Sequence, residues 1–502
     1  MTPYSDKEKC TGCGACAEAC FNNSIRMESD DDGFLYPIVI AETCINCGRC
    51  TKVCDMSRVS SLKREKRAFL AFSRNEELRQ ASSSGGVFSE LANYYIENGG
   101  VVYGGAFDYG YSGVSHIRCD TPLDLHKIQG SKYIQSKMSG VFMNVRRDLE
   151  QGREVLFSGT PCQINGIKAF LDKEYSNFLC ISVICHGVPS PKVWEEYLHS
   201  IEMTIGKVLY VDFRDKRRKG WLNYHITMKG LKRDYSVVAD EDYYMNGFIE
   251  NLFLRPSCYA CDGIIKTENA DIILGDYWGC EKQFMDLDHF MGCSAVIVNT
   301  PRGQRAIDSL NSKLTLKDSS VYNIKKENPS YDCRAVENIY RRAFFNSLNN
   351  KDEDIQSLLR RYVLKRHTNE FKERQRVIVE LFKNSRAFER AGGLKEYIYN
   401  NNVCLYAYTD ITKELINALS KCGGKKTVYV SDRDIEKLKN SGFKRILSKD
   451  EMKRKYTSRL IRKVIICSLY YLNDIFDEMV AEGFDKSDLI SVESVVWDCI
   501  GA

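Results

Sequence analysis

The sequence lacks a long hydrophobic run, an excess of charge of one sign and an apolar leader, and each absence excludes a class of protein. The longest apolar stretches, such as residues 464–467, fall far short of the roughly 20 residues that a membrane-spanning helix needs. The net charge is +5, from 72 basic and 67 acidic residues, which gives no case for nucleic acid or an anionic membrane as a partner. The first residues contain no apolar signal segment, so we expect a cytoplasmic protein with reduced cysteines.

The rest of the composition is that of a folded protein with several domains. With 43% hydrophobic and 28% charged residues, it excludes disordered, collagen-like and coiled-coil proteins. Its 502 residues are enough for about two to four domains. The residue present in unusual number is cysteine, with 21 in the chain. Without a secretion signal, so many cysteines indicate metal binding rather than disulfides.

Two runs of four cysteines near the N-terminus share the spacing C-x2-C-x2-C-x3-C. In this pattern the first three thiolates bind one cubane and the fourth binds the other. We therefore predict a bacterial-type two-cluster ferredoxin module with two 4Fe–4S clusters, the first held by Cys10, Cys13, Cys16 and Cys54, the second by Cys44, Cys47, Cys50 and Cys20. Phe21 and Asp55 replace the proline that usually follows the fourth cysteine, which removes no ligand. Structural zinc is the alternative, but zinc sites favour two separated C-x2-C pairs.

Changes in composition divide the chain into five predicted segments. These are the ferredoxin-type module at 1–58, a polar linker at 59–80, a central α/β region at 81–310, a helical connector at 311–398 and a small α/β domain at 399–502. The basic residues from Lys63 to Arg67 are most simply solvated, with a docking patch for an acidic electron carrier as the alternative.

Two short apolar runs in the central region predict neighbouring parallel strands. Residues 154–157 lead into Ser158-Gly159-Thr160-Pro161-Cys162, and residues 178–184 lead into Cys185-His186-Gly187. Function in such sheets gathers at the carboxyl ends of strands, where Cys162 and Cys185 both lie. With the pair Cys258 and Cys261, they form a plausible ligand set for a third 4Fe–4S cluster. Structural zinc, catalytic or unrelated cysteines, and Cys280 or Cys293 as other ligands stay open.

The remaining cysteines are most simply small core residues: Cys119, Cys180, Cys333, Cys404, Cys422, Cys467 and Cys499.

Two polar segments of the central region are suited to phosphate. Ser82-Ser83-Ser84-Gly85-Gly86 opens a helical pattern, where backbone N–H groups and the helix dipole can hold an anion. The segment from Gly130 to Lys137 contains Lys132, which could neutralise a pyrophosphate. Taken alone, the first is equally a helix cap and the second a surface turn.

Together these motifs resemble the coenzyme F-420 (deazaflavin) hydrogenase/dehydrogenase beta-subunit family, in the form with an N-terminal dicluster ferredoxin domain. The resemblance covers about residues 1–310 and rests on six motifs in order: residues 83–86, 130–133, 157–163, 184–191, 255–261 and 275–279. Members of the family typically bind one FAD and one or more 4Fe–4S clusters.

The resemblance implies roles for the residues that carry it. It makes Ser84, Gly85, Gly86, Ser131, Lys132, Tyr133, Ser158, Gly159 and Thr160 expected contacts of FAD. It also makes Cys162, Cys185, Cys258 and Cys261 the expected ligands of a third cluster. His186 is a candidate proton donor or hydrogen-bond partner of that cluster, although a packed histidine with neither role is the simpler interpretation. Trp278 could stack on a ring, or fill the core.

The C-terminal segment predicts a small Rossmann-like sheet. Strand patterns at residues 403–407, 427–430, 445–447 and 464–467 alternate with helical ones. The strand at residues 464–467, with the helix after it and residues 481–484, is similar to small Rossmann-like modules in proteins of sugar-nucleotide and surface-glycan metabolism. The glycine-rich phosphate loop is absent, because Ala407-Tyr408-Thr409-Asp410 stands in its place, so nucleotide binding there is doubtful.

The sequence therefore predicts an α/β protein (α+β overall) that is a cytoplasmic iron–sulfur flavoprotein oxidoreductase. We expect electrons from a low-potential donor such as ferredoxin to pass through the clusters to FAD and on to a small-molecule substrate, with sugar-related compounds as one class, or to run in reverse. The main alternative is a non-catalytic electron-transfer beta subunit of a hydrogenase or dehydrogenase complex. A third is a glycan-assembly scaffold or redox sensor in which the clusters are structural.

Overall fold

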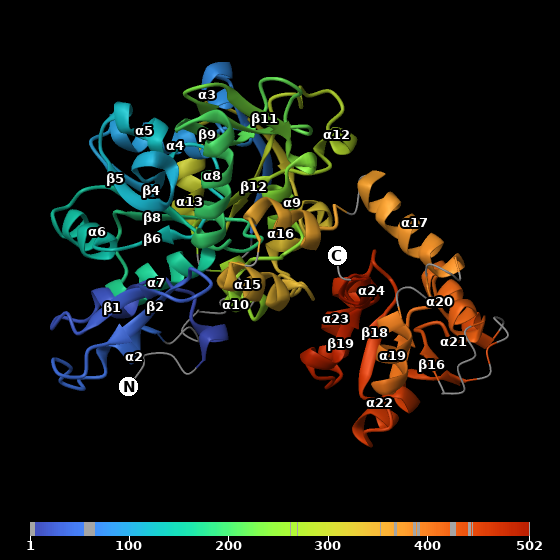
Figure 1. Ribbon diagram of the computed structural model, residues 1–502. Coiled ribbons are helices and arrows are strands. Elements are labelled where there is room, and N and C mark those ends of the chain that lie inside the picture. Colours follow the sequence, from blue (N-terminus) through green and yellow to red (C-terminus); the bar gives the residue numbers. More distant parts are fainter. Residues whose placement is uncertain are drawn as a thin grey trace. The chain divides into compact units, whose positions relative to one another are not determined.

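A computed structural model describes residues 6–54, 66–261, 263–268, 270–351, 353–365, 369–384, 388, 392–421, 428–439, 443 and 445–500 (Figure 1). The chain divides into two compact units. The first unit is Met1–Ala335 with Phe345–Arg360, and the second is Val336–Phe344 with Arg361–Ala502. Both are built of helices and sheets, so the predicted α/β fold class is confirmed. Within the basic stretch from Lys63 to Arg67, interpreted above as solvated with a docking patch as the alternative, Lys63 and Arg64 lie outside the described residues.

A mixed nine-stranded sheet forms the centre of the first unit. Its strands, in spatial order, are β14 (Leu314–Ser319), β3 (Arg67–Ser73), β13 (Ser294–Val298), β12 (Ile272–Asp276), β8 (Phe178–Val183), β7 (Val155–Gly159), β4 (Val101–Phe107), β5 (Val114–Cys119) and β6 (Ser136–Lys137). The strands β12, β8, β7 and β4 run parallel, so their carboxyl ends meet at one edge. The two parallel strands predicted around residues 155 and 180 are β7 and β8, paired from Val155 with Phe178 to Gly159 with Ser182.

Both faces of this sheet are buried, which explains the continuous apolar runs of its inner strands. Along β7, Val155 and Phe157 point into one hydrophobic cluster, while Leu156 points into the other. Figure 1 shows helices on both sides of the sheet. The alternation makes a three-layer domain with two cores.

The helices of the first unit connect these strands and cover them. They are α3 (Glu76–Ala81), α4 (Val87–Glu97), α5 (Pro122–Ile128), α6 (Val141–Glu150), α7 (Pro161–Leu171), α8 (Pro191–Ile205), α9 (Tyr243–Ile249), α10 (Pro256–Tyr259), α11 (Gly263–Glu268), α12 (Cys280–Gln283), α13 (Pro301–Asp308) and α14 (Val321–Glu327). The helices α15 (Arg341–Asn350) and α16 (Ile355–Tyr362) contain residues of both units. A separate antiparallel sheet has the strands β9 (Val208–Asp215), β10 (His225–Gly230) and β11 (Asp234–Val238).

Two predicted segment boundaries are wrong. The predicted linker at 59–80 contains β3, a central strand whose residues Ala68 to Ala71 are all buried. The predicted helical connector at 311–398 begins with β14, which pairs with β3 at the edge of the same sheet. An edge strand has fewer neighbours, and the sequence of β14 is correspondingly polar. Its pattern therefore resembles that of the solvated helices that follow it.

The N-terminal module (residues 6–54) is a small α/β segment of the first unit. A single 3-10 turn, η1 (Lys7–Lys9), precedes α1 (Ala15–Glu18), the hairpin of β1 (Ile25–Ser29) and β2 (Leu35–Val39), and α2 (Arg49–Cys54). The helices α1 and α2 pack on each other and on α7 of the central domain. Gly12, Gly14 and Gly48 all have positive φ, which lets the cysteine-bearing loops turn tightly.

The second unit is a parallel five-stranded sheet with flanking helices. The strand order is β17 (Ile446–Leu447), β16 (Tyr429–Ser431), β15 (Val403–Tyr406), β18 (Lys463–Ile466) and β19 (Leu489–Ser491). The helices are α17 (Asn369–Lys383), α19 (Gly392–Asn400), α20 (Asp410–Lys421), α21 (Ile435–Lys439), α22 (Lys449–Thr457), α23 (Leu472–Ala481) and α24 (Val492–Ile500). With its first strand at the centre, the sheet has the predicted Rossmann-like, doubly wound order.

None of the helices in the described part of the chain combines the length and the apolar character that crossing a lipid bilayer requires.

Candidate cofactor and cluster site

Four thiols from three separate segments of the chain converge at the carboxyl edge of the parallel strands. Cys162 follows β7 and Cys185 follows β8, while Cys258 and Cys261 belong to the segment around α10. Backbone hydrogen bonds from Ser190 N to Phe253 O (3.0 Å) and from Arg255 N to Val188 O (2.9 Å) bring this segment beside Cys185. The structure thus assembles the four predicted ligands; their role as ligands stays a prediction.

The electrostatics of these thiols suit a metal cluster. Burial and then the charge of Cys258 raise the pKa of the Cys185 thiol, while burial and the charges of Cys162 and Cys261 raise the pKa of Cys258 to about 12. Burial thus opposes ionisation of Cys185 and Cys258, and a cationic iron–sulfur core that bound them as thiolates would supply a compensating positive charge. The amide of Val188 donates to Cys258 Sγ (3.3 Å), a hydrogen bond of the kind that tunes cluster potential.

The motif Thr160-Pro161-Cys162-Gln163 has a local explanation in the start of α7. Thr160 is the N-cap, Pro161 is the first helical residue, and Gln163 Oε1 accepts from Thr160 N (2.9 Å) in a capping box. Cys162 therefore lies in the first turn of a helix, where the helix dipole favours a thiolate.

The N-terminal module gathers its own thiols. Burial and the charges of Cys13, Cys54 and Cys10 raise the pKa of Cys16, so these four thiols lie together. This is the grouping that the alternating ligand rule predicts, with the distant Cys54 completing the first set. The second set has Cys47 exposed and Cys20, Cys44 and Cys50 partly buried; its pairing stays a prediction.

Residues of two family motifs attach the module to the central domain. Arg255 is fully buried, and its guanidinium donates to Cys10 O (2.7 Å), Leu35 O (2.9 Å) and Gln135 Oε1 (3.2 Å). Ser190 caps α8 and its hydroxyl donates to Asp32 O (2.5 Å). These motif residues therefore dock the module, a role that no spacing in the sequence indicates.

The cysteines predicted to bind the first cluster lie directly against those predicted to bind the third. A Cβ added at Gly166, in α7, would lie 3.0 Å from Cys13 Sγ and 3.1 Å from Cys13 Cβ, so a larger residue would crowd this thiol. The charge of Cys162, one turn earlier on α7, is among the causes that raise the pKa of Cys13 to about 11, after burial. The thiols Cys13, Cys162 and Cys185 also line one cavity. The arrangement places two cluster sites next to each other and next to a ligand-sized space.

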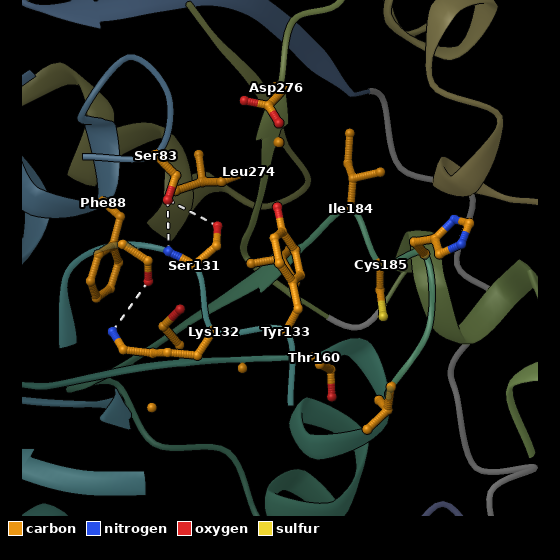
Figure 2. A pocket seen from close by; sticks show the side chains of 18 of the residues that line it. Ser83, Phe88, Ser131, Lys132, Tyr133, Thr160, Ile184, Cys185, Leu274 and Asp276 are labelled. Atoms are coloured by element: carbon orange, nitrogen blue, oxygen red, sulfur yellow. Dashed lines mark hydrogen bonds between the residues drawn. The ribbon is translucent and has the colours of Figure 1, made fainter. Parts of the chain in front are cut away.

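That cavity has a volume of about 500 Å³, within the usual range for ligand pockets. Of the predicted FAD contacts, those that line it are Ser84, Gly86, Ser131, Lys132, Tyr133, Ser158, Gly159 and Thr160. Gly85 lies behind the wall, where its amide donates to Ser294 Oγ (3.0 Å) and an added Cβ would be 2.4 Å from Ala71 O. Figure 2 shows Ser83 hydrogen-bonded to Ser131, with Lys132, Tyr133, Thr160 and Cys185 around the same space.

Anion-binding groups face this cavity. Gly86 is the N-cap of the helix α4 and has φ of 87°, and because glycine has no side chain to cap the first amides of the helix, these can face a ligand. Lys132 Nζ donates to Gln129 O (2.6 Å) and Gly130 O (3.2 Å), and burial lowers the pKa of Lys132 to about 7. A phosphate beside this amine would restore its charge.

The sequence analysis missed three polar groups of the cavity wall. Arg214 is buried and donates to Asp276 Oδ2 (2.9 Å), and His116 Nε2 lies 2.9 Å from Ser158 O. Burial lowers the pKa of His116 to about 4, which keeps it neutral. Asp276 belongs to the motif at residues 275–279. Arg214 and His116 lie in strands of ordinary pattern, which gives no indication of a site.

His186 and Trp278 both line the cavity. The two ring nitrogens of His186 lie 3.2 Å from Phe248 O and 3.4 Å from Ser330 Oγ, and burial lowers its pKa. These contacts suit a neutral, oriented imidazole, and its catalytic role stays a prediction. Trp278 stacks on Trp221 with ring centroids 4.6 Å apart and an interplanar angle of 8°.

The other cysteines mostly fill the core, as expected for Cys119, Cys180, Cys404 and Cys467. Cys333 is exposed, so the core interpretation is wrong there. Cys422 and the side chain of Cys499 lie outside the described residues. Cys280 and Cys293 are grouped with His289.

In the second unit, the position of the missing phosphate loop is closed by side-chain contacts. The amide of Tyr408 donates to Asp432 Oδ2 (2.5 Å), and Thr409 Oγ1 donates to Cys467 O (2.9 Å). These hydrogen bonds occupy the backbone after β15, at the position where a glycine-rich loop would bind a phosphate.

Comparisons with known proteins match two parts of the chain. Residues 152–321 match the family model that describes the C terminus of the beta subunit of coenzyme F420 hydrogenase/dehydrogenase, and residues 9–57 match a 4Fe-4S dicluster domain. These matches confirm the resemblance that the sequence motifs indicated. A solved structure, of the F420-reducing NiFe hydrogenase complex from Methanosarcina barkeri, contains a chain 16% identical to this one, with a TM-score of 0.36, over 53% of this chain and 89% of that one. No curated protein matches the chain significantly.

Proposed function

From a chain that combines an iron–sulfur dicluster domain with the beta-subunit domain of an oxidoreductase family, we propose a flavin-dependent oxidoreductase. It exchanges electrons with a low-potential carrier such as ferredoxin and converts a small molecule bound beside the central cavity. The observation that carries this proposal is one cavity lined both by cluster-type thiols and by anion-binding groups. When bound, 4Fe–4S clusters supply one-electron transfer and FAD supplies the two-electron step.

The residues of the cavity suit the two ends of a dinucleotide cofactor. The start of α4 and Lys132 would hold its phosphates, because both offer donors to an anion. Trp278 lines the cavity and stacks on the buried Trp221, whose Nε1 donates to Asp276 Oδ1 (3.0 Å), so the pair supports a flat apolar wall at Trp278. Such a wall excludes water and can orient an aromatic ring.

The N-terminal module offers a contact surface for the carrier. Cys47 is exposed, and the apolar side chains of Ile45 and Phe21, which are near the cysteines in sequence, are 60% and 58% exposed. Arg49 lies over the ring of Phe21, at 5.6 Å from its centroid. An apolar patch with a cationic group fits an acidic redox protein.

The test is the iron and flavin content of anaerobically purified protein, followed by turnover with reduced ferredoxin and the deazaflavin coenzyme as the first acceptor. We expect about twelve irons and one FAD per chain, from three cubanes and one flavin. About eight irons with one FAD would remove the third cluster. About eight irons without flavin, even after reconstitution, would contradict the proposal. Turnover only in the presence of a stably co-purifying partner would favour the relay-subunit alternative.

Binding of FAD is expected to weaken as the pH rises above about 7. Burial lowers the pKa of free Lys132 to about 7, and a bound phosphate raises it, so binding takes up a proton in this range. The affinity then falls by up to about tenfold per pH unit until the pKa of the complex is reached. Fluorescence titration of the flavin-free protein between pH 6 and 9 measures this slope.

Lys132→Met should remove the slope and weaken binding by about 10–100-fold, the usual cost of losing a charged hydrogen-bond donor. Lys137→Met is the matched control, because Lys137 is exposed and pairs with Asp108 (3.1 Å). An unchanged slope in Lys132→Met would assign the proton to another group, such as Lys216, whose pKa burial also lowers to about 7.

A further inference from the structure

Three ligand-type side chains meet outside the cluster set, in the segment between α12 and β13. Cys280 opens α12, Cys293 immediately precedes β13, and His289 lies in the loop that joins them. Their ligand atoms all lie within 4.8 Å of one another, the one such group among the residues that the structure describes. Both thiols are fully buried, and the imidazole is half-buried. Thiols and imidazole together are the donors that zinc prefers.

The distances match the edges of a zinc tetrahedron. His289 Nδ1 lies 3.4 Å from Cys280 Sγ and 3.6 Å from Cys293 Sγ. Zn–S bonds of about 2.3 Å and Zn–N bonds of about 2.0–2.1 Å, at tetrahedral angles, separate sulfur and nitrogen by about 3.5–3.6 Å. The imidazole nitrogen thus already lies at the distance from each thiol that one shared ion requires, and the two sulfurs lie within 4.8 Å of each other.

The orientation of the imidazole is fixed as it is in metal sites. His289 Nε2 lies 2.8 Å from Phe284 O, so this nitrogen carries the proton and donates to the carbonyl. Nδ1 therefore presents its lone pair to the two thiols. A metal-bound histidine commonly donates its other N–H to a backbone carbonyl in this way.

The loop of residues 284–293 supports the wall of the cavity, and a bound ion would stabilise the conformation of this loop. Its carbonyls accept from two buried cations: Arg79 Nη2 donates to Asp288 O (2.7 Å) and Gly292 O (2.8 Å), and Lys216 Nζ donates to Met291 O. Lys216 Nζ also donates to Ser84 O (2.7 Å), in the wall of the cavity. A Cβ at Gly292 would lie 2.8 Å from Trp221, so this loop also backs the stacked tryptophans.

We propose that Cys280, His289 and Cys293 bind a zinc ion that pins the 284–293 loop behind the cavity wall. Three protein ligands leave the fourth tetrahedral position to a water molecule. The two thiols lose their protons on binding, and the imidazole binds as the neutral tautomer already present. The site is separate from the predicted iron–sulfur ligands, and its spacing is C-x8-H-x3-C.

The test measures zinc and iron together, by elemental mass spectrometry, in protein purified anaerobically from zinc-supplemented medium. We expect about one zinc per chain in the native protein and less than about a tenth of that in His289→Ala. His289→Cys should keep the zinc, because a third thiolate replaces the imidazole. His199→Ala, an exposed histidine of α8, is the matched control and should change neither metal.

Thiol labelling gives an independent readout. Cys280 and Cys293 should resist alkylation in the native protein and react after treatment with a zinc chelator, whereas in His289→Ala they should react without it. Three outcomes would overturn the assignment: no zinc above trace in the native protein, an extra iron in place of zinc, or a disulfide between Cys280 and Cys293. Zinc that persists unchanged in His289→Ala would place the ion elsewhere.

Discussion

Cys185→Ser is expected to remove about four of about twelve irons per chain, because one cubane loses a ligand while the N-terminal module keeps two. Carrier-dependent turnover should fall by more than the roughly 10–100-fold that loss of an outer hydrogen-bond partner of a metal site costs. The physical reason is the position of Cys185, at the end of β8, beside Cys162 and Cys258 and in the cavity wall. Iron analysis, flavin content and turnover of the anaerobic variant measure the effect.

Cys180→Ala is the matched control. Cys180 is fully buried in the same strand, but its side chain belongs to the hydrophobic core on one face of the sheet. It should keep the full iron content, with at most a lower thermal stability. If Cys185→Ser retained all its iron, Cys185 would not be a cluster ligand. The four converging thiols would then be interpreted as zinc ligands or as core residues.

Arg255→Met is expected to undock the N-terminal module. The variant keeps the length of the side chain but leaves Cys10 O, Leu35 O and Gln135 Oε1 without their donor in a buried site. Each buried acceptor left unpaired costs about 1–3 kcal/mol. At about 2–4 °C per kcal/mol for a domain of this size, the first thermal transition should fall by at least about 5 °C. Turnover with the carrier should fall together with it.

Arg147→Met, an exposed position on α6, controls for the loss of one positive charge. A separate measurement distinguishes undocking from general destabilisation: turnover with a small chemical reductant, which can reach the cavity without the module, should be retained at low temperature. An unchanged melting temperature and unchanged carrier turnover in Arg255→Met would contradict the docking role.

Much of the site could be predicted from the sequence because its signals are local. The spacing C-x2-C-x2-C-x3-C needs no tertiary information, since one tight loop brings three thiols to one cubane. The strand ends that carry Cys162 and Cys185 are visible as apolar runs that stop at Gly, Thr or His. The residues that complete the site are different. Arg214 and His116 come from strands of ordinary pattern, and only the fold aims them at the cavity.

The wrong predictions also concern features that depend on the fold and not on the local sequence. The strand β3 was hidden because it follows a basic stretch that reads as linker, and β14 because an edge strand can be polar. The group of Cys280, His289 and Cys293 has a spacing that no common zinc motif shares, so only the fold around the 284–293 loop reveals it. Cys333 shows the reverse, a residue of a usually buried type that the fold leaves exposed.

Local residue patterns were enough to predict an iron–sulfur protein of α/β class that resembles the beta-subunit family of coenzyme F420 hydrogenase/dehydrogenase, because these signals depend on residues close together in the chain. The folded structure was needed to see which cysteines of separate segments meet, that Arg255 and Ser190 dock the module, and that Cys13 packs on Gly166 beside Cys162. The reason is that such contacts join residues far apart in the chain: Ser190 and Asp32 are 158 positions apart, and Arg255 and Cys10 are 245. They depend on strand order and helix packing, which local residue patterns do not encode.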